Sequence, residues 1–186
     1  MNHSEHVRLI RDGVAESRGR WADLGAGDGT FTLALADVLG AGSQITAVDR
    51  DEDSLRRLAD WLRRAFPAVA VETLTADFGR PLPLQGLDGV LAANSLHFVP
   101  EKLPVLQRLQ EMLKPGGRLI VVEYDSDQRN CWVPHPFSYG RWEDMAQRAG
   151  FVRTRRLHSR SSRFMGSTYS AVSERPLAAG EANSAL

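Results

Sequence analysis

One stretch decides the fold of this chain, and it reads Ala22-Asp23-Leu24-Gly25-Ala26-Gly27-Asp28-Gly29-Thr30. The apolar residues before the first glycine predict a short buried strand, and those after Thr30 predict a helix packed on it. Alternate glycines allow a tight turn and let a ligand approach the main chain. The free N–H groups of the helix start face the same point. The stretch therefore predicts a ligand-binding turn, with a turn that serves packing alone as the alternative.

The spacing of the glycines indicates the kind of ligand. In dinucleotide-binding turns the third glycine comes three residues after the second. Here Gly25, Gly27 and Gly29 are spaced one residue more tightly. Asp23 precedes the turn and Asp28 lies within it, so a pyrophosphate would be repelled. The turn favours a ligand that carries an ammonium group.

The rest of the chain alternates strand and helix patterns, which indicates a parallel sheet covered on both faces. Two final strands without a helix between them predict an antiparallel hairpin at one edge. We expect an α/β, Rossmann-like, seven-stranded and mostly parallel sheet in one domain over 1–173. Residues 174–186 are rich in Ala, Gly and Ser and predict a disordered tail. The strands after the first are expected at 45–48, 69–74, 87–93, 118–123, 151–157 and 165–173, and the helices at 6–14, 31–39, 53–65, 100–113 and 141–148.

These features resemble the class I S-adenosylmethionine-dependent methyltransferases, whose first motif reads acidic-x-G-x-G-x-G. The Lys-Pro-Gly-Gly turn at 114–117 also recurs in that family. The resemblance covers about Val7 to Ser173 and is to the small-molecule branch that includes ubiquinone and menaquinone methyltransferases. It implies S-adenosylmethionine as cofactor and S-adenosylhomocysteine as product.

The resemblance also implies how the cofactor is held. Asp23 would lie near its amino group, Asp49 would bind the ribose hydroxyls, and Asp77 would meet the adenine amino group. Asp49 is alternatively a helix cap, although Asp51 and Asp53 are better placed for that. Asp77 is alternatively a simple turn residue. The cofactor-binding residues expected on this basis are Asp23, Gly25, Ala26, Gly27, Gly29, Asp49, Arg50, Asp77, Phe78, Asn94 and Leu96.

Methyl transfer by direct displacement needs little covalent help, because alignment of acceptor and methyl group supplies most of the rate gain. For an acidic acceptor that uses a base, His97 is the first candidate, and the others are Glu123, Tyr124 and His135. Each is alternatively structural or lines the substrate pocket. The residues expected to line an acceptor pocket, or else to pack the loop after the fifth strand, are Tyr124, Trp132, His135 and Tyr139.

Composition narrows the function classes. The 186 residues carry a formal net charge of zero, so nothing global favours nucleic acid or membrane as a partner. No apolar run reaches the roughly 18 residues of a membrane span, and the polar amino end does not read as a secretory signal. The single Cys131 excludes an internal disulfide and a cysteine metal cluster, and no metal site is expected. A cytoplasmic protein is predicted.

Two features keep alternatives open. One basic run predicts a solvated edge hairpin or a nucleic-acid contact, and it consists of Arg153, Arg155, Arg156, Arg160 and Arg163. The short segment before the first strand indicates a truncated N-terminal lid, so the acceptor pocket is open or completed in a homodimer. We therefore expect a small-molecule methyltransferase. The alternatives are a nucleic-acid methyltransferase and a non-catalytic module that binds the cofactor or its demethylated product.

Overall fold

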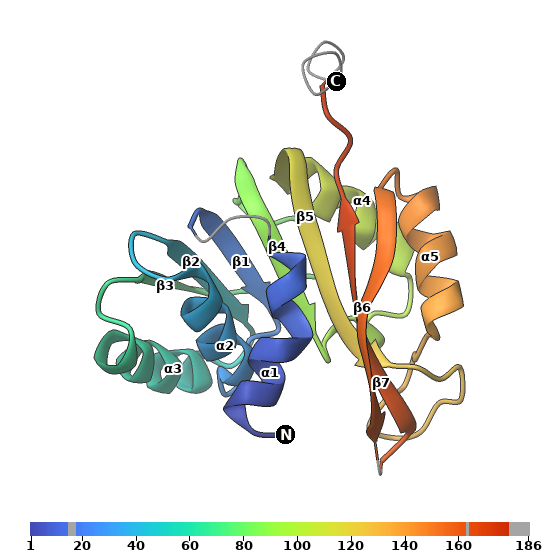
Figure 1. Ribbon diagram of the computed structural model, residues 1–186, viewed down its shortest axis with the longest axis horizontal. Helices are drawn as coiled ribbons and strands as arrows, with labels where there is room; N and C mark the ends of the chain where they lie inside the picture. The colour runs from blue at the N-terminus through green and yellow to red at the C-terminus, as the bar shows by residue number, and fades with distance from the viewer. Residues whose placement is uncertain (15–17, 163, 179–186) are drawn as a thin grey trace.

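The computed structural model describes residues 1–14, 18–162 and 164–178, which form one seven-stranded sheet (Figure 1). The expectations for Arg163 and for 179–186 lie outside the described residues. The strand order is β3-β2-β1-β4-β5-β7-β6. The strands are β1 Arg20–Leu24, β2 Gln44–Asp49, β3 Ala70–Thr75, β4 Leu87–Ala93, β5 Leu113–Tyr124, β6 Val152–Ser162 and β7 Gly166–Glu174.

The strand directions confirm the predicted fold class. Strands β1 to β5 are parallel to one another, whereas β7 is antiparallel to both β5 and β6. Because β6 and β7 are joined by a short turn, they form the predicted C-terminal hairpin. The carboxyl ends of the central strands point to the lower edge of the view in Figure 1, where the N-terminus also lies.

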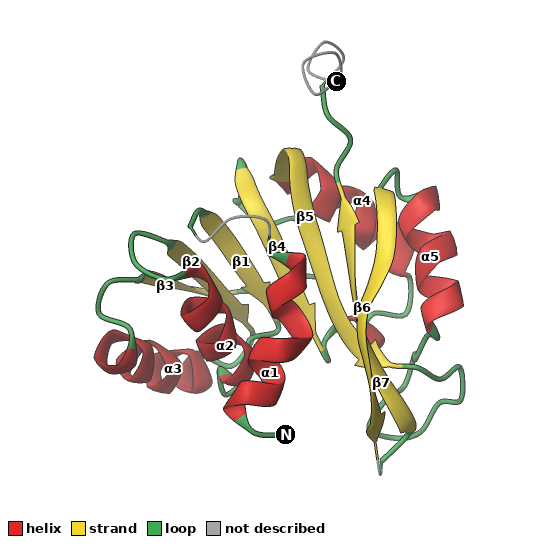
Figure 2. Cartoon of the chain, viewed as in Figure 1, coloured by secondary structure: helices red, strands yellow, loops and turns green. Residues whose placement is uncertain are grey.

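Helices cover both faces of the sheet, as Figure 2 shows. On one face α1 His3–Ile10, α2 Thr30–Leu39 and α3 Glu52–Ala65 enclose one apolar core. On the other face α4 Lys102–Met112 and α5 Tyr139–Arg148 enclose a second core. The central strands are buried on both sides, which is why their sequences are continuously apolar rather than alternating.

The first helix begins earlier than its apolar pattern predicts. Asn2 accepts a hydrogen bond from the main-chain N–H of Glu5, and the Glu5 side chain accepts one from the N–H of Asn2. This reciprocal capping box fixes the start of α1 at His3 rather than at His6. A turn of 3-10 helix over Arg11–Gly13 then ends the segment.

The fifth strand is longer than predicted. The Lys-Pro-Gly-Gly segment at 114–117 lies within β5 as a bulge, since the pairing with β4 shifts between Leu87 and Gly89. The main-chain N–H of Arg175 donates to the Gly117 carbonyl over 2.8 Å, and the N–H of Gly116 donates back to the carbonyl of Arg175 over 3.0 Å. The ordered domain therefore continues past residue 173.

Candidate functional site

The glycine turn lies where the strand order reverses, between β1 and β4, which is where open α/β sheets bind ligands. The main-chain N–H groups of Gly25 and Ala26 donate to the Val48 carbonyl over 2.8 and 3.0 Å. The N–H of Gly27 donates to Oδ2 of Asp49 over 2.8 Å. These hydrogen bonds attach the turn after β1 to the end of β2. They also hold the Asp49 carboxylate of β2 beside the turn.

The glycines of the turn serve different purposes. Gly27 has φ of 52°, and a Cβ added there would meet no atom within 4 Å, so the main chain is open to a ligand at this point. Gly29 has φ of 83°, and a Cβ added there would collide with the Leu58 side chain of α3. Gly29 therefore permits close packing of α2 on α3, and it lines neither of the two cavities described below.

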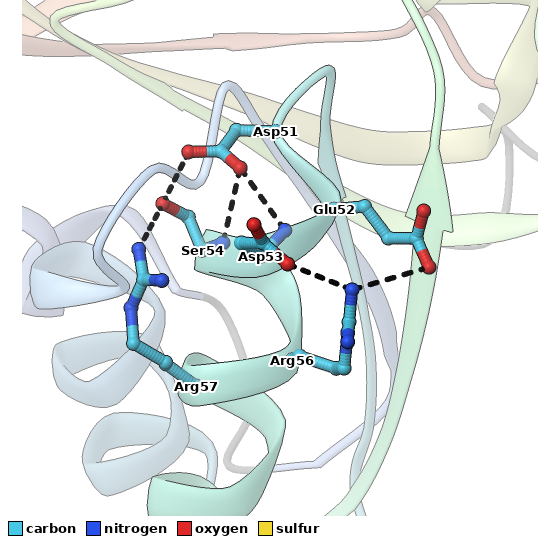
Figure 3. Close-up of polar contacts among 6 residues, drawn as sticks. All are labelled: Asp51, Glu52, Asp53, Ser54, Arg56 and Arg57. Atoms are coloured by element: carbon cyan, nitrogen blue, oxygen red, sulfur yellow. Dashed lines mark hydrogen bonds and ion pairs between the residues drawn. The ribbon is translucent and has the colours of Figure 1, made fainter.

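Asp51, and not Asp49, caps α3 (Figure 3). The Asp51 carboxylate accepts the main-chain N–H groups of Asp53 and Ser54 over 3.0 and 3.2 Å. It also accepts the Ser54 hydroxyl over 2.7 Å. Asp49 accepts only the N–H of Asp51 on that side, over 2.9 Å through Oδ1. The Asp49 side chain is therefore not used for helix capping.

A cavity of about 750 Å³ opens at the carboxyl ends of the first four strands. It brings together seven of the predicted cofactor-binding residues, namely Gly25, Gly27, Asp49, Arg50, Asp77, Phe78 and Asn94. Asn94 has φ of 52°, which is uncommon for a residue other than glycine and places its backbone in a tight turn. Asp77 also accepts the N–H of Gly79 over 2.9 Å, so it is a turn residue as well as a lining residue.

A smaller cavity of about 260 Å³ adjoins the first and shares Gly25, Gly27 and Asn94 with it. Ala26 and Asp23 also line this space. The Asp23 carboxylate is 1% exposed and accepts the Thr32 hydroxyl over 2.6 Å. Burial raises the pKa of Asp23 from its ordinary value of 3.8 to about 7, and the neighbouring Asp49 carboxylate adds to the rise. A cationic group would therefore be favoured beside Asp23.

Two predicted residues face away from both cavities. The Leu96 side chain is fully buried in the core under α4, because the chain turns inward through a 3-10 helix over Leu96–Phe98. His97 is 3% exposed, and its Nδ1 lies 2.7 Å from Oε2 of Glu123. Lys102 is buried nearby and donates to the main-chain carbonyls of Val99 and His135. His97 thus belongs to a buried hydrogen-bonded cluster at the end of β4.

The four predicted acceptor residues are not brought together. Tyr124, at the end of β5, has its ring 6.2 Å from that of His97. Trp132 is 71% exposed, and His135 is exposed while its main-chain N–H donates to the His97 carbonyl. Tyr139 begins α5, where its hydroxyl donates to Glu143 over 2.8 Å. His135, through its main chain, and Tyr124, through its ring, are the residues of this set that contact the cluster around His97.

Residues that sequence reasoning missed also line the larger cavity. Ser95 is 3% exposed, and its hydroxyl has no hydrogen-bond partner in the described part of the chain. Arg108, on α4, donates to the Gly79 carbonyl over 2.5 Å, while its Nε atom is buried without a partner there. The position of Ser95 directly after Asn94 is a signal that could have identified it. No motif in the sequence around Arg108 predicts that this residue lines the cavity.

The described arginines of the basic run on β6 each have a polar partner within the chain, and three of the four partners are acidic side chains. Arg153 pairs with Glu174 at 3.2 Å, and Arg160 pairs with Glu5 at 3.0 Å. The Arg156 guanidinium lies 3.5 Å from the Asp125 carboxylate. The Arg155 guanidinium donates to the main-chain carbonyl of Asp12 over 3.0 Å. These pairings favour the solvated-hairpin interpretation over a nucleic-acid contact. Over residues 1–14, 18–162 and 164–178, no cluster of metal ligands is found and no helix is long and apolar enough to cross a membrane.

Comparison with known proteins agrees with this geometry. A protein-family model described as a methyltransferase domain matches residues 22–119. A 2-phytyl-1,4-naphtoquinone methyltransferase from Synechococcus elongatus is 29% identical over 115 residues, or 61% of this chain and 49% of that protein. An uncharacterised methyltransferase from Mycobacterium bovis is 34% identical over 114 residues, or 61% of this chain and 43% of that protein. The chain thus spans about half the length of these relatives.

Among solved structures, the YcgJ protein of Bacillus subtilis superimposes with a TM-score of 0.74 at 12% sequence identity. The superposition covers 94% of this chain and 99% of that protein, which supports the Rossmann-like fold. The matching family model spans more than half of the residues, from β1 into β5, and includes the glycine turn and the four strand ends around the larger cavity. The chain therefore belongs to the methyltransferase-domain family.

Proposed function

We propose that this chain transfers a methyl group from S-adenosylmethionine to a small-molecule acceptor. The observation that best supports this is the larger cavity, where residues predicted separately from four strand ends come together. The residues present fit the cofactor. Asp23 is a buried carboxylate suited to an ammonium group, and Gly27 leaves the main chain open to a closely lying ligand.

The nucleoside part would be held by the ends of β2 and β3. Each Asp49 oxygen already accepts one main-chain N–H, which leaves lone pairs for two ribose hydroxyls. Because these N–H groups hold the carboxylate in place, little ordering is needed when a ligand binds. Arg50 and Phe78 line the same cavity and would flank the adenine ring, while Asp77 would accept its amino group.

When bound, the cofactor would supply a methyl group on a positively charged sulfur. The acceptor atom would attack the methyl carbon as the carbon–sulfur bond breaks. The protein contributes alignment of the acceptor and exclusion of water. For an acidic acceptor we assign the base to His97, because Glu123 holds Nδ1 and leaves Nε2 to take the proton. Phe98 lines the cavity with its ring 4.3 Å from that of His97, so rotation of Phe98 would expose the imidazole to the acceptor.

Three aromatic rings next to His97 favour an apolar acceptor. Phe98 and Phe164 are 56% and 52% exposed, so both rings offer apolar surface to a ligand. The ring of Tyr124 lies 5.6 Å from that of Phe164 and 6.2 Å from that of His97, whose own ring contacts Phe98. The rings come from the segment after β4, the end of β5 and the β6–β7 turn, so an acceptor lying on them would touch three elements.

A reducing compartment fits the one cysteine. Cys131 is exposed and carries a free thiol, which an oxidising environment would expose to disulfide exchange. We therefore place the protein in the cytoplasm.

Calorimetry with three ligands tests the proposed function. S-adenosylmethionine and S-adenosylhomocysteine should bind, and NAD should not. Binding of NAD without binding of S-adenosylmethionine would overturn the proposal. Turnover is then measured as S-adenosylhomocysteine released with a panel of apolar phenols, amines and thiols. Tight cofactor binding without turnover on a broad panel would instead favour a non-catalytic binding module.

A further inference from the structure

The smaller cavity has a wall that the sequence does not assign to any function. Besides residues of the glycine turn, it is lined by Met1 and His6, which belong to the amino end of the chain and to α1. The cavity connects through Gly25 and Gly27 to the space proposed for the nucleoside. A ligand that extends from the nucleoside site past the glycine turn would therefore meet α1.

His6 has hydrogen-bonding capacity that the described protein does not use. The residue is 5% exposed, and its Nδ1 atom is buried without a hydrogen-bond partner in the described ranges. Buried polar atoms in native proteins are nearly always paired, so an unpaired one calls for a missing partner such as a ligand or a water molecule. Burial also lowers the pKa of His6, which keeps the free imidazole neutral.

The first helix holds His6 rigidly in this position. The ring packs edge-on against Phe31 of α2, with 4.7 Å between ring centroids. On the same helix His3 Nε2 lies 3.1 Å from Asp37 of α2, and Glu5 pairs with Arg160 of β6 at 3.0 Å. Because α1 is attached to both α2 and β6, His6 is a built part of the cavity wall and not part of a free terminus.

The two walls of the cavity have complementary chemistry. Asp23, on the β1 side, is a buried acceptor suited to a cation. His6, on the α1 side, is a buried ring that can donate to an anion, and the amino end of α2 adds a positive dipole end nearby. The exposed Asp28 carboxylate also lines this cavity and adds to the attraction that Asp23 exerts on an ammonium group. Such a pair of walls matches the zwitterionic end of an amino acid, in which an ammonium and a carboxylate share one carbon atom.

We propose that His6 recognises the carboxylate of the amino-acid end of the cofactor, so that the first helix selects ligands that carry this end. The proposal rests on the proposed function, since it assumes that the nucleoside lies in the larger cavity.

Two ligands that differ only in this end test the proposal. S-adenosylhomocysteine carries the amino-acid end, whereas 5′-methylthioadenosine has the same nucleoside and thioether without it. In calorimetry, His6→Leu should weaken the binding of S-adenosylhomocysteine by about tenfold, as expected for loss of a hydrogen bond to a charged group. The same variant should bind 5′-methylthioadenosine with an affinity within about twofold of the wild type. His6→Gln, which keeps a donor, should recover most of the lost affinity.

A matched control lies one helical turn away. His3→Leu removes a ring from the same helix that contacts Asp37 and does not line this cavity, so it should change neither affinity. Equal loss of both ligands in His6→Leu would show that the ring is only structural, and no loss of either would refute the assignment. If the wild-type protein binds neither ligand, the proposed function itself fails. Thermal melting of each variant separates unfolding from loss of binding.

Discussion

Replacement of Asp23 by asparagine should make the protein more stable and bind its cofactor less well. The carboxylate is fully buried, and its pKa is raised from 3.8 to about 7. The folded protein therefore holds a proton that the unfolded chain releases between about pH 4 and pH 7, so wild-type stability falls as the pH rises across that window. Asparagine carries no charge and can still accept the Thr32 hydroxyl, so Asp23→Asn removes this penalty.

The size of the effect follows from the shift in pKa. A difference of about three pKa units corresponds to at most about 4 kcal/mol at pH 7 and to less than about 1 kcal/mol at pH 4. For a chain of this length each kcal/mol raises the melting temperature by roughly 2–4 °C. The variant should thus melt several degrees above wild type at pH 7.5 and close to it at pH 4.5, as differential scanning calorimetry would show.

Binding provides the second half of this test. Because a cationic ligand needs the ionised Asp23, the affinity of the wild type for S-adenosylhomocysteine should rise with pH up to about 7 and then level off. Asp23→Asn should bind at least tenfold more weakly at pH 7.5. Asp60→Asn is the control, since Asp60 is an exposed carboxylate on α3 that lines neither cavity. A stability difference that is the same at both pH values would refute the reasoning about the buried carboxylate.

Three further variants separate ligand contacts from structural roles. Gly27→Val should abolish S-adenosylhomocysteine binding, because the side chain enters the open space at a positive φ; affinity kept within about threefold would place the ligand elsewhere. Asp49→Ala should weaken binding at least tenfold, whereas Asp51→Ala should keep affinity and cost about 1 kcal/mol of stability as a lost helix cap; the opposite pattern would exchange their roles. His97→Gln should keep cofactor affinity and lower kcat for an acidic acceptor; unchanged kcat would rule out a base at this position.

The parts of the site that the sequence predicts are those with local signals. Gly25, Gly27 and Asp49 each follow an apolar strand, and parallel strands bring their carboxyl ends to one edge. The same reasoning places Asp77 and Asn94 at that edge. Predictions are weaker for residues a few positions beyond a strand end. The 3-10 helix directs Leu96 into the core and leaves Ser95 at the cavity.

The parts that the sequence does not predict depend on contacts between distant segments. His6 reaches the cavity because α1 packs on α2, and Arg108 reaches it because of the way α4 lies over the sheet. Neither position is marked by a motif, since both lie on helices whose apolar patterns report only which side is buried. The length of β5 was missed for a similar reason, because pairing with β4 absorbs a turn-forming segment as a bulge.

The charged outer strand has a consequence for the behaviour of the protein at high concentration. β6 is the last strand of the sheet, so one of its sides has no neighbouring strand in the described fold and could pair with another polypeptide. Its arginines, together with two shifts in its pairing with β7, disrupt the flat, uncharged ladder that such pairing requires. Replacement of Arg153 and Arg155 by threonine would therefore be expected to promote fibrillar or lateral self-association, even though neither residue is near the cavities. The arginine run thus protects the edge of the sheet against aggregation.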